Sequence, residues 1–305
     1  MSEIAGLRGQ VVTVVEVGPR DGLQNESAII STADKVSFID RLSDAGLPAI
    51  EVTAFVSPRW VPQMADAADV AATFARRAGV RYRALVPNLR GFDRAVEAGI
   101  GEVAVVAGVS ETFNRKNLNQ SVDDSLTEYT RVCERAATLR VPVRGYLSTA
   151  FGCPYEGEVS TDAVVRRTRQ LLELGVFEIA ISDTIGVAHP GQVVAVLEAL
   201  ADAVPIERVA LHFHDTLGTA LANVLAGLTQ GVRTFDASAG GLGGCPYAPG
   251  AAGNLATDDL VFMLDGLGMH TGVSAERLAE ATAFIASKVG HASASRYVQG
   301  RLARV

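Results

Sequence analysis

Val209-Ala210-Leu211-His212-Phe213-His214 is an apolar run broken only by histidines, and its length and composition predict a buried β-strand. The amphipathic run at residues 220–230 follows it and ends at the helix-stopping pair Gln230-Gly231. A second apolar run, residues 233–238, comes next. This part of the chain therefore predicts a strand, a helix and a strand in succession.

The same alternation occurs eight times. The apolar runs are residues 11–17, 48–53, 82–86, 102–107, 141–148, 177–182, 209–214 and 233–238. The helical runs are residues 32–44, 64–77, 89–98, 122–139, 161–174, 191–203, 220–230 and 255–267. Eight repeats favour an α/β fold of the (β/α)8 TIM-barrel type over an open doubly wound sheet. No G-x-G-x-x-G follows the first strand, which weakens the alternative of a nucleotide-binding sheet.

We expect the catalytic barrel to span residues 1–270. Residues 271–305 are expected to form a C-terminal helical extension of the same domain, with a helix at 275–289 and then a polar, mobile end.

Composition narrows the class of protein. The 305 residues are 48% hydrophobic and 20% charged, which is typical of a globular chain with a large core. The net charge of −7 argues against nucleic-acid binding, and no apolar run is long enough to cross a membrane. Three distant cysteines and no N-terminal signal pattern favour a reducing, cytoplasmic setting.

His212 and His214 are two apart on one strand, so they project from the same face, about 7 Å apart along the strand. Two converging imidazoles can hold a divalent metal. The alternative at this point is a pair of hydrogen-bonded polar residues at the end of a strand.

Other polar residues gather where predicted strands end, which is where barrel enzymes carry their active sites. Asp21 follows the first strand and can complete an Asp-His-His ligand set, and Asn254 is a candidate fourth ligand. Glu51 and Asp183 end two further strands and are candidates to orient a ligand or to hold Arg20. An oxygen and nitrogen site without a thiolate cluster favours Lewis-acid catalysis over structural zinc.

Each residue also has a purely structural alternative. Arg20 and Glu51 could belong to ordinary ion pairs, and Tyr146 could pack in the core. Cys245 could be a small buried residue, but it lies in a glycine-rich loop, which is no core environment.

Six motifs, in order from about residue 11 to residue 273, resemble 3-hydroxy-3-methylglutaryl-CoA (HMG-CoA) lyases. They are EVGPRDGLQNE (16–26), FVSPRWVPQM (55–64), GCPYEG (152–157), DTIG (183–186), GLGGCPYA (241–248) and GNLAT (253–257). Claisen-condensing synthases of the same superfamily resemble the chain only at Arg20-Asp21-Gly22 and at His212 and His214. They usually carry an acidic residue at the position of Leu23 and lack the GGCPY loop.

The resemblance implies a metal-dependent TIM-barrel lyase that cleaves HMG-CoA to acetyl-CoA and acetoacetate, in the usual setting of leucine breakdown. It implies that Mg²⁺ or Mn²⁺ is bound by Asp21, His212, His214 and Asn254. The catalytic residues that it implies are Arg20 for the enolate, Asp21 or His212 for proton transfer, Cys245 for protonation, and Glu51 and Asp183 as supports. Substrate contacts are expected from Arg20, Gln24, Asn117, Arg144 and Tyr146.

The chain departs from many relatives at Ser27, where they carry a lysine. If that lysine holds the phosphates of CoA, those phosphates must be met elsewhere, and Arg59, Arg115 or Lys116 are candidates. The expected partner is therefore an acyl-CoA, in a cytoplasmic enzyme that the family suggests is a homodimer or a higher homo-oligomer.

Overall fold

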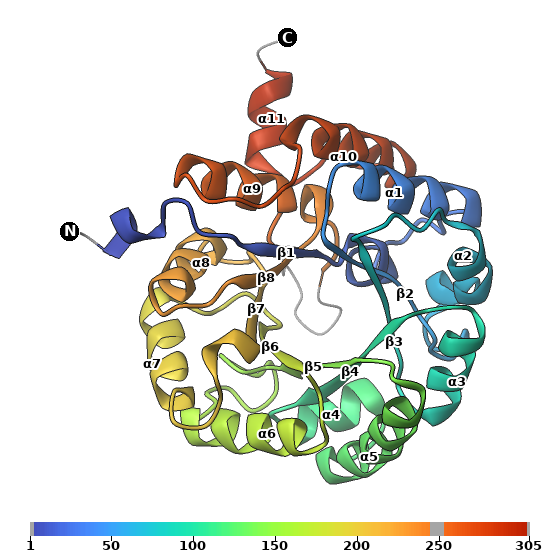
Figure 1. The fold of residues 1–305 in the computed structure, drawn as a ribbon, viewed down its shortest axis with the longest axis vertical. Coiled ribbons are helices and arrows are strands. Elements are labelled where there is room, and N and C mark those ends of the chain that lie inside the picture. The colour runs from blue at the N-terminus through green and yellow to red at the C-terminus, as the bar shows by residue number, and fades with distance from the viewer. Residues whose placement is uncertain (1–2, 245–252, 304–305) are drawn as a thin grey trace.

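The computed structural model describes residues 3–244 and 253–303, and its centre is a closed barrel of eight parallel strands in sequential order, β1 to β8 (Figure 1). The last strand pairs with the first, with Thr13 opposite Thr234 and Glu16 opposite Ala237. The strands are β1 (Thr13–Glu16), β2 (Ala49–Ala54), β3 (Arg81–Leu85), β4 (Glu102–Gly108), β5 (Val143–Ser148), β6 (Glu178–Asp183), β7 (Val209–Phe213) and β8 (Thr234–Ala237). The predicted TIM barrel is confirmed.

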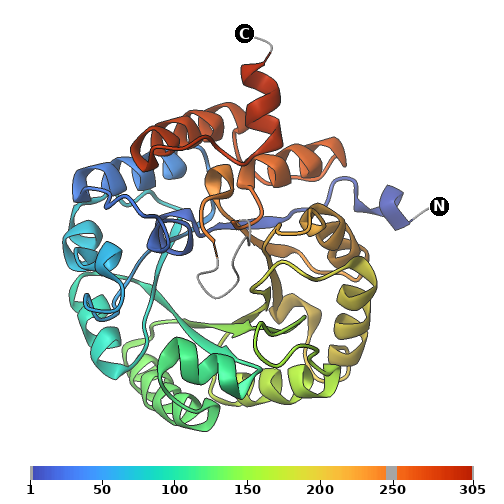
Figure 2. The same ribbon diagram turned by 180° about the vertical axis from the view of Figure 1, so that it is seen from behind.

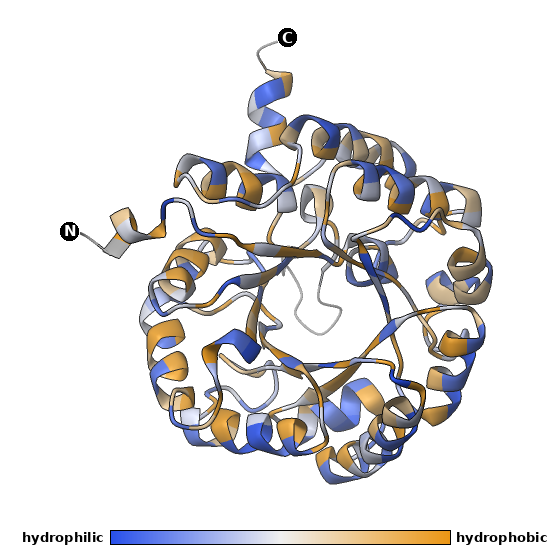
Figure 3. Cartoon of the chain, viewed as in Figure 1, coloured by the Kyte–Doolittle hydropathy of each residue, from blue (hydrophilic) through white to orange (hydrophobic). Residues whose placement is uncertain are grey.

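Helices form a ring around the barrel, seen from both ends in Figures 1 and 2. They are α1 (Thr32–Asp44), α2 (Ala67–Thr73), α3 (Leu89–Glu97), α4 (Glu111–Leu118), α5 (Val122–Leu139), α6 (Thr161–Glu173), α7 (Pro190–Leu200), α8 (Ala220–Thr229), α9 (Thr257–Gly266), α10 (Ala275–Val289) and α11 (Arg296–Leu302). The helices of the ring contain both hydrophobic and hydrophilic residues (Figure 3), and on α1 the hydrophobic Phe38, Ile39 and Leu42 are buried. None of the helices in the described ranges is long and apolar enough to cross a membrane.

Local signals in the sequence explain most helix boundaries. Ser121 begins α5 with a capping box, in which its side chain accepts from Asp124 N at 3.0 Å and the Asp124 carboxylate accepts from Ser121 N. Gly231, predicted to stop the helix before it, has a φ of +95°, and Gly46, Gly99 and Gly175 have a positive φ just after α1, α3 and α6. At Gly46, with φ of +93°, a Cβ atom would lie 2.5 Å from Gly272 O, so any side chain would clash with the C-terminal extension.

The helices differ from the sequence prediction in three places. Helix α4 was not predicted, because Glu111–Leu118 is too polar to show a periodic apolar face. Its one signal is Ser110, whose Oγ accepts from Phe113 N at 3.1 Å as an N-cap. The predicted helix at residues 64–77 is only Ala67–Thr73, since Phe74 is extended and Ala75 N donates to Asp40 Oδ1. The C-terminal end expected to be mobile contains α11, whose N-cap is Ser295.

The interior of the barrel contains a buried network of ion pairs. Arg144 on β5 reaches Asp236 on β8 with two hydrogen bonds of 2.8 and 2.9 Å, and it also donates to Glu178 on β6 at 2.6 Å. Because β5 and β8 are not neighbours in the sheet, the first of these ion pairs crosses the lumen. All three side chains are buried, and the one cation, Arg144, is shared between two carboxylates beneath the end of the barrel where the polar loops gather.

Candidate active site

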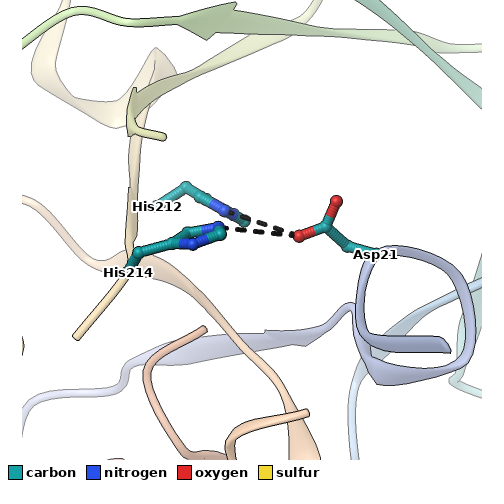
Figure 4. Close-up of side chains that lie close together, drawn as sticks. All are labelled: Asp21, His212 and His214. Atoms are coloured by element: carbon teal, nitrogen blue, oxygen red, sulfur yellow. Dashed lines mark ion pairs between the residues drawn. The ribbon is translucent and has the colours of Figure 1, made fainter. Parts of the chain in front are cut away.

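Asp21, His212 and His214 meet at the carboxyl ends of the strands (Figure 4). Asp21 lies on the tight turn Gly18–Gly22 after β1, and both imidazoles point toward its carboxylate, His212 from β7 and His214 from just after the end of β7. Asp21 Oδ2 is 3.9 Å from Nε2 of each histidine, and the candidate ligand atoms all lie within 4.8 Å of one another. Two ligands that are each about 2.1 Å from one cation stand roughly 3 to 4.2 Å apart. Both distances from Asp21 to the histidines lie in this range, as expected for ligands of one divalent cation.

Asn254 provides a further test of this fit. Its Nδ2 donates to Asp21 Oδ2 at 3.0 Å and to Leu242 O at 3.1 Å, which places the amide beside the triad. Its Oδ1 is buried and accepts no hydrogen bond from any residue that the structure describes. A buried acceptor without a donor is costly, and a cation would satisfy it. At Gly243, with φ of +113°, a Cβ would lie 2.7 Å from Asn254 Nδ2, so glycine is required for this approach.

The charge on Asp21 suits a metal ligand. Burial opposes its ionisation, but the Arg20 guanidinium and the imidazoles of His212 and His214 lower its pKa to about 2. Arg20 Nη1 donates to Asp21 Oδ1 at 2.5 Å, which leaves Oδ2 facing the histidines. Asp21 is therefore a carboxylate at neutral pH.

His212 is oriented by a carboxylate that the sequence analysis missed. Its Nδ1 lies 3.3 Å from Asp236 Oδ2, and these two residues face each other in the register of β7 and β8. Burial opposes ionisation of Asp236, but the ion pair with Arg144 lowers its pKa well below the usual range. An ionised Asp236 accepts a hydrogen bond from Nδ1–H of His212, so the lone pair of Nε2 faces Asp21.

Arg20 is held rigidly at the wall of the site. Its Nε donates to Glu51 Oε1 on β2, and Glu51 Oε2 accepts from the Tyr146 hydroxyl at 2.8 Å. The Arg20 guanidinium also lies over the Tyr146 ring, 5.5 Å from its centroid. Glu51 thus occupies the supporting position predicted for it.

A cavity of about 600 Å³ opens beside these residues. Of the residues predicted to bind substrate, Arg20, Gln24, Asn117 and Tyr146 line it. Arg144 does not line it. Its side chain is fully buried among Asp236, Glu178 and the Tyr146 ring, so it supports the site from below instead of contacting substrate.

Of the two roles predicted for Asp183, the structure does not show a contact with Arg20. Its carboxylate accepts from Val187 N at 3.1 Å and Ala188 N at 2.9 Å, so it orders the loop after β6 and does not hold Arg20. Cys245 lies outside the described residues.

Glu16 is a second residue that the sequence analysis missed. Its Oε1 accepts from Gly18 N at 2.8 Å and from Ala239 N at 2.9 Å, and its Oε2 accepts from Thr257 Oγ1 at 2.7 Å. One buried carboxylate therefore anchors the turn that carries Asp21 and both ends of the loop that leads to Asn254. The only sequence signal was an acidic residue inside an apolar strand.

Asp236→Asn tests whether the carboxylate sets the tautomer of His212. We expect metal affinity to fall roughly 10- to 100-fold, the usual cost of losing the partner of a ligating histidine. Manganese titration by calorimetry measures this. Because the substitution also weakens the ion pair with Arg144, Glu178→Gln is the control: it removes the other partner of Arg144 and should leave metal affinity near wild type. Equal losses in the two variants would assign the effect to Arg144.

Comparisons with known proteins agree with this geometry. The family model described as HMGL-like matches residues 11–285. The mitochondrial hydroxymethylglutaryl-CoA lyase of Mus musculus is 51% identical over 288 residues, covering 94% of this chain and 89% of the mouse protein. The 3-hydroxy-3-isohexenylglutaryl-CoA/hydroxymethylglutaryl-CoA lyase of Pseudomonas aeruginosa is 50% identical, covering 96% and 98%.

A solved structure of an HMG-CoA lyase is also similar to this chain. The HMG-CoA lyase of Bacillus subtilis superposes with a TM-score of 0.95 at 49% identity, covering 97% of this chain and 99% of that one. The family match spans most of the chain, including the turn of Asp21 and both histidines. This chain therefore belongs to the hydroxymethylglutaryl-CoA lyase family of carbon–carbon lyases.

Proposed function

We propose that the chain cleaves HMG-CoA to acetyl-CoA and acetoacetate, with Asp21, His212, His214 and Asn254 holding Mg²⁺ or Mn²⁺. The observation that carries this proposal is the Asp-His-His cluster next to Arg20 in one cavity, in a chain about half identical to lyases named for this substrate. When bound, the cation polarises the C3 hydroxyl of the substrate and lowers its pKa.

The residues of the chain support a retro-Claisen cleavage. The C3 hydroxyl proton passes to Asp21 or His212, the two groups at the cluster that can accept it. The C3–O bond becomes a carbonyl, the C2–C3 bond breaks, and its electron pair moves into the thioester as an enolate. One product is acetoacetate, and the enolate becomes acetyl-CoA when C2 takes up a proton.

Arg20 is the group suited to stabilise the enolate. It lines the cavity, and its partners Glu51 and Tyr146 fix its position before the reaction begins. Although burial opposes its charge, the carboxylates of Glu51 and Asp21 raise its pKa further above its usual value, so it stays cationic. A fixed cation where negative charge develops is worth more than one that must reorganise.

The chain has Ser27 where many relatives carry a lysine, so other cations are needed to bind the phosphates of CoA. Arg115 and Lys116 on α4 line the cavity, whereas Arg59 is not among the lining residues. Arg115 is 2.9 Å from Glu111 and largely exposed, and the Lys116 ammonium lies 5.0 Å from the centroid of the Tyr155 ring. We therefore propose that Arg115 and Lys116 bind the phosphates of CoA.

We propose that Cys245 donates the proton that C2 of the enolate takes up. Cys245→Ala should lower turnover by at least about 100-fold and leave metal affinity unchanged, because the thiol acts as a proton donor and not as a ligand. Turnover assays paired with manganese titration check both parts, and Cys133→Ala, which removes a buried thiol from α5, is the control. Turnover near wild type in Cys245→Ala would remove this residue from the mechanism.

A panel of acyl-CoA thioesters tests the function. Release of acetyl-CoA from HMG-CoA in the presence of Mg²⁺ or Mn²⁺ is expected, and no release would contradict the proposal. A second candidate substrate is 3-hydroxy-3-isohexenylglutaryl-CoA, because the Pseudomonas aeruginosa relative is named for it and Leu85, Val106 and Phe113 give the cavity apolar walls. Comparing kcat/KM for the two thioesters distinguishes a strict lyase from a broader one.

The family also supports a cytoplasmic homodimer or higher homo-oligomer that acts in leucine breakdown and ketone-body formation. Sedimentation of the purified protein tests the oligomeric state.

A further inference from the structure

A short buried turn, Ala239–Gly241, follows β8 and lies against the C-terminal extension. Helix α10 of the extension packs on this turn as well as on α1 (Figure 1). At Gly240, with φ of +69°, a Cβ atom would lie 2.9 Å from the side chain of Thr282 and 3.0 Å from Ser293 Oγ. The turn and the extension are therefore so close that only glycine fits between them.

The same turn also contacts the segment that carries Asn254. A Cβ atom at Gly253 would clash with Gly241 O, and a Cβ atom at Gly241 would lie 3.3 Å from Asn254 O. The Asn254 side chain donates to Leu242 O, the residue after the turn, at 3.1 Å. The turn therefore links Asn254 to the C-terminal extension.

Hydrogen bonds hold both polar groups of the Gly240 backbone. Its N–H donates to Asp258 Oδ2 at 2.8 Å, and Thr282 Oγ1 is 3.0 Å from each oxygen of that carboxylate. Its carbonyl oxygen accepts from Ala294 N at 2.9 Å and from Ser293 Oγ at 3.2 Å. The N–H is thus tied to the extension through Asp258, and the carbonyl is tied to it directly.

The Thr282 hydroxyl matters because the carboxylate that it meets is buried. Asp258 is 1% exposed and Thr282 is 0% exposed. Burial raises the pKa of the Asp258 carboxyl, and the Gly240 N–H and the Thr282 hydroxyl oppose that rise. Loss of the hydroxyl would leave a buried carboxylate with one donor fewer and would weaken its hold on Gly240.

We propose that Thr282 on α10 is a positioning residue for Asn254, so that the C-terminal extension completes the metal site. This inference rests on the proposed function, because it takes Asn254 as a metal ligand. Thr282 is not among the residues that line the cavity, so it acts through Asp258 and the glycine turn and not on the substrate.

Calorimetric titration of the metal-free protein with Mn²⁺ tests this role in Thr282→Val, which keeps the shape of the side chain and removes the hydroxyl. We expect the affinity to fall about three- to tenfold, less than the loss on removing a direct partner of a ligand. Thr282→Ser keeps the hydroxyl and should stay near wild type. Thr168→Val is the matched control and should leave the affinity unchanged. Thr168 is equally buried on α6, and its Oγ1 has no hydrogen-bond partner within the described ranges.

The same titration in an Asn254→Ala background shows whether Thr282 acts through Asn254. Thr282→Val should then cost less than about twofold, because the ligand that it positions is gone. A purely structural role would lower the affinity equally in both backgrounds, and that result would overturn the proposal, as would an unchanged affinity in Thr282→Val. If Thr282→Val does not fold, Ser293→Ala, which removes a direct bond to Gly240 O, goes through the same cycle with the same expectations.

The outcomes separate this inference from the proposed function. An affinity that falls in Asn254→Ala but not in Thr282→Val leaves Asn254 as a ligand and contradicts its support by the extension. Wild-type protein that binds no Mn²⁺ contradicts the proposed metal site, and the inference with it.

Discussion

We expect Arg20→Gln to lower kcat for HMG-CoA cleavage by about 1,000-fold or more. The guanidinium lines the cavity, is only 6% exposed, and is fixed by Glu51 and by the Tyr146 ring, so it is preorganised for an oxygen that gains negative charge. Removing one neutral donor of this kind costs roughly 100- to 1,000-fold, and loss of a buried cation costs at least as much. Glutamine keeps a donor but no charge, so folding is retained while the stabilisation is lost. Steady-state kinetics measure the loss of kcat, and circular dichroism checks that the variant is folded.

Glu51→Gln is the companion variant for Arg20. It removes the carboxylate that holds Arg20 but leaves the guanidinium in place. We expect a smaller loss of kcat, with little change in KM, because Glu51 contacts Arg20 and Tyr146 and does not line the cavity. If Arg20→Gln kept kcat within tenfold of wild type, Arg20 would have no part in stabilising the enolate.

His214→Ala weakens Mn²⁺ binding by more than about 100-fold. Loss of a group that merely orients a ligand costs 10- to 100-fold, so loss of the ligand itself should exceed that range. Asp21, His212 and Asn254 remain, and therefore activity should recover in part at high Mn²⁺ or Mg²⁺. Calorimetric titration and the dependence of activity on metal concentration measure the two effects.

His270→Ala is the control for His214→Ala, because it makes the same change at an exposed histidine far along the chain from β7. Its metal affinity and activity should match wild type. An unchanged affinity in His214→Ala would remove this residue from the set of ligands and leave the pairing with Asp21 without a function.

The sequence predicted the barrel well because the patterns that indicate its strands and its helices are both local. A strand covered on both faces is a short apolar run, and a surface helix shows its apolar face at a period of 3.6 residues. Helix α4 lacked this face and was missed, although its cap Ser110 was visible.

The convergence of Asp21 with His212 and His214 was predictable for a related reason. Strand parity places both histidines on one face, and closure of the barrel brings the turn after β1 near β7.

The sequence does not show how far below the active-site end of the barrel a side chain lies. Arg144 and Tyr146 share one face of β5, but Tyr146 lies two residues nearer the carboxyl end and lines the cavity, whereas Arg144 lies below it. Asp236 was missed because its role depends on the register between β7 and β8, which no local pattern encodes.

The hydrogen-bond partners of Asp183 could not be predicted because a strand-end carboxylate has two possible kinds of partner. The sequence shows that it faces the active-site end, but not whether it reaches a side chain or turns back to the loop. In the structure, the backbone N–H groups of Val187 and Ala188 donate hydrogen bonds to the two carboxylate oxygens of Asp183.

The central claim is that the Asp21, His212 and His214 cluster supports metal-dependent cleavage of HMG-CoA, and product analysis before and after chelation tests it most directly. The purified protein should convert HMG-CoA to equal amounts of acetyl-CoA and acetoacetate, should lose this activity when divalent cations are removed, and should regain it when Mn²⁺ or Mg²⁺ is restored. Unaltered cleavage in the thoroughly chelated protein, or no cleavage with either cation present, would contradict the account.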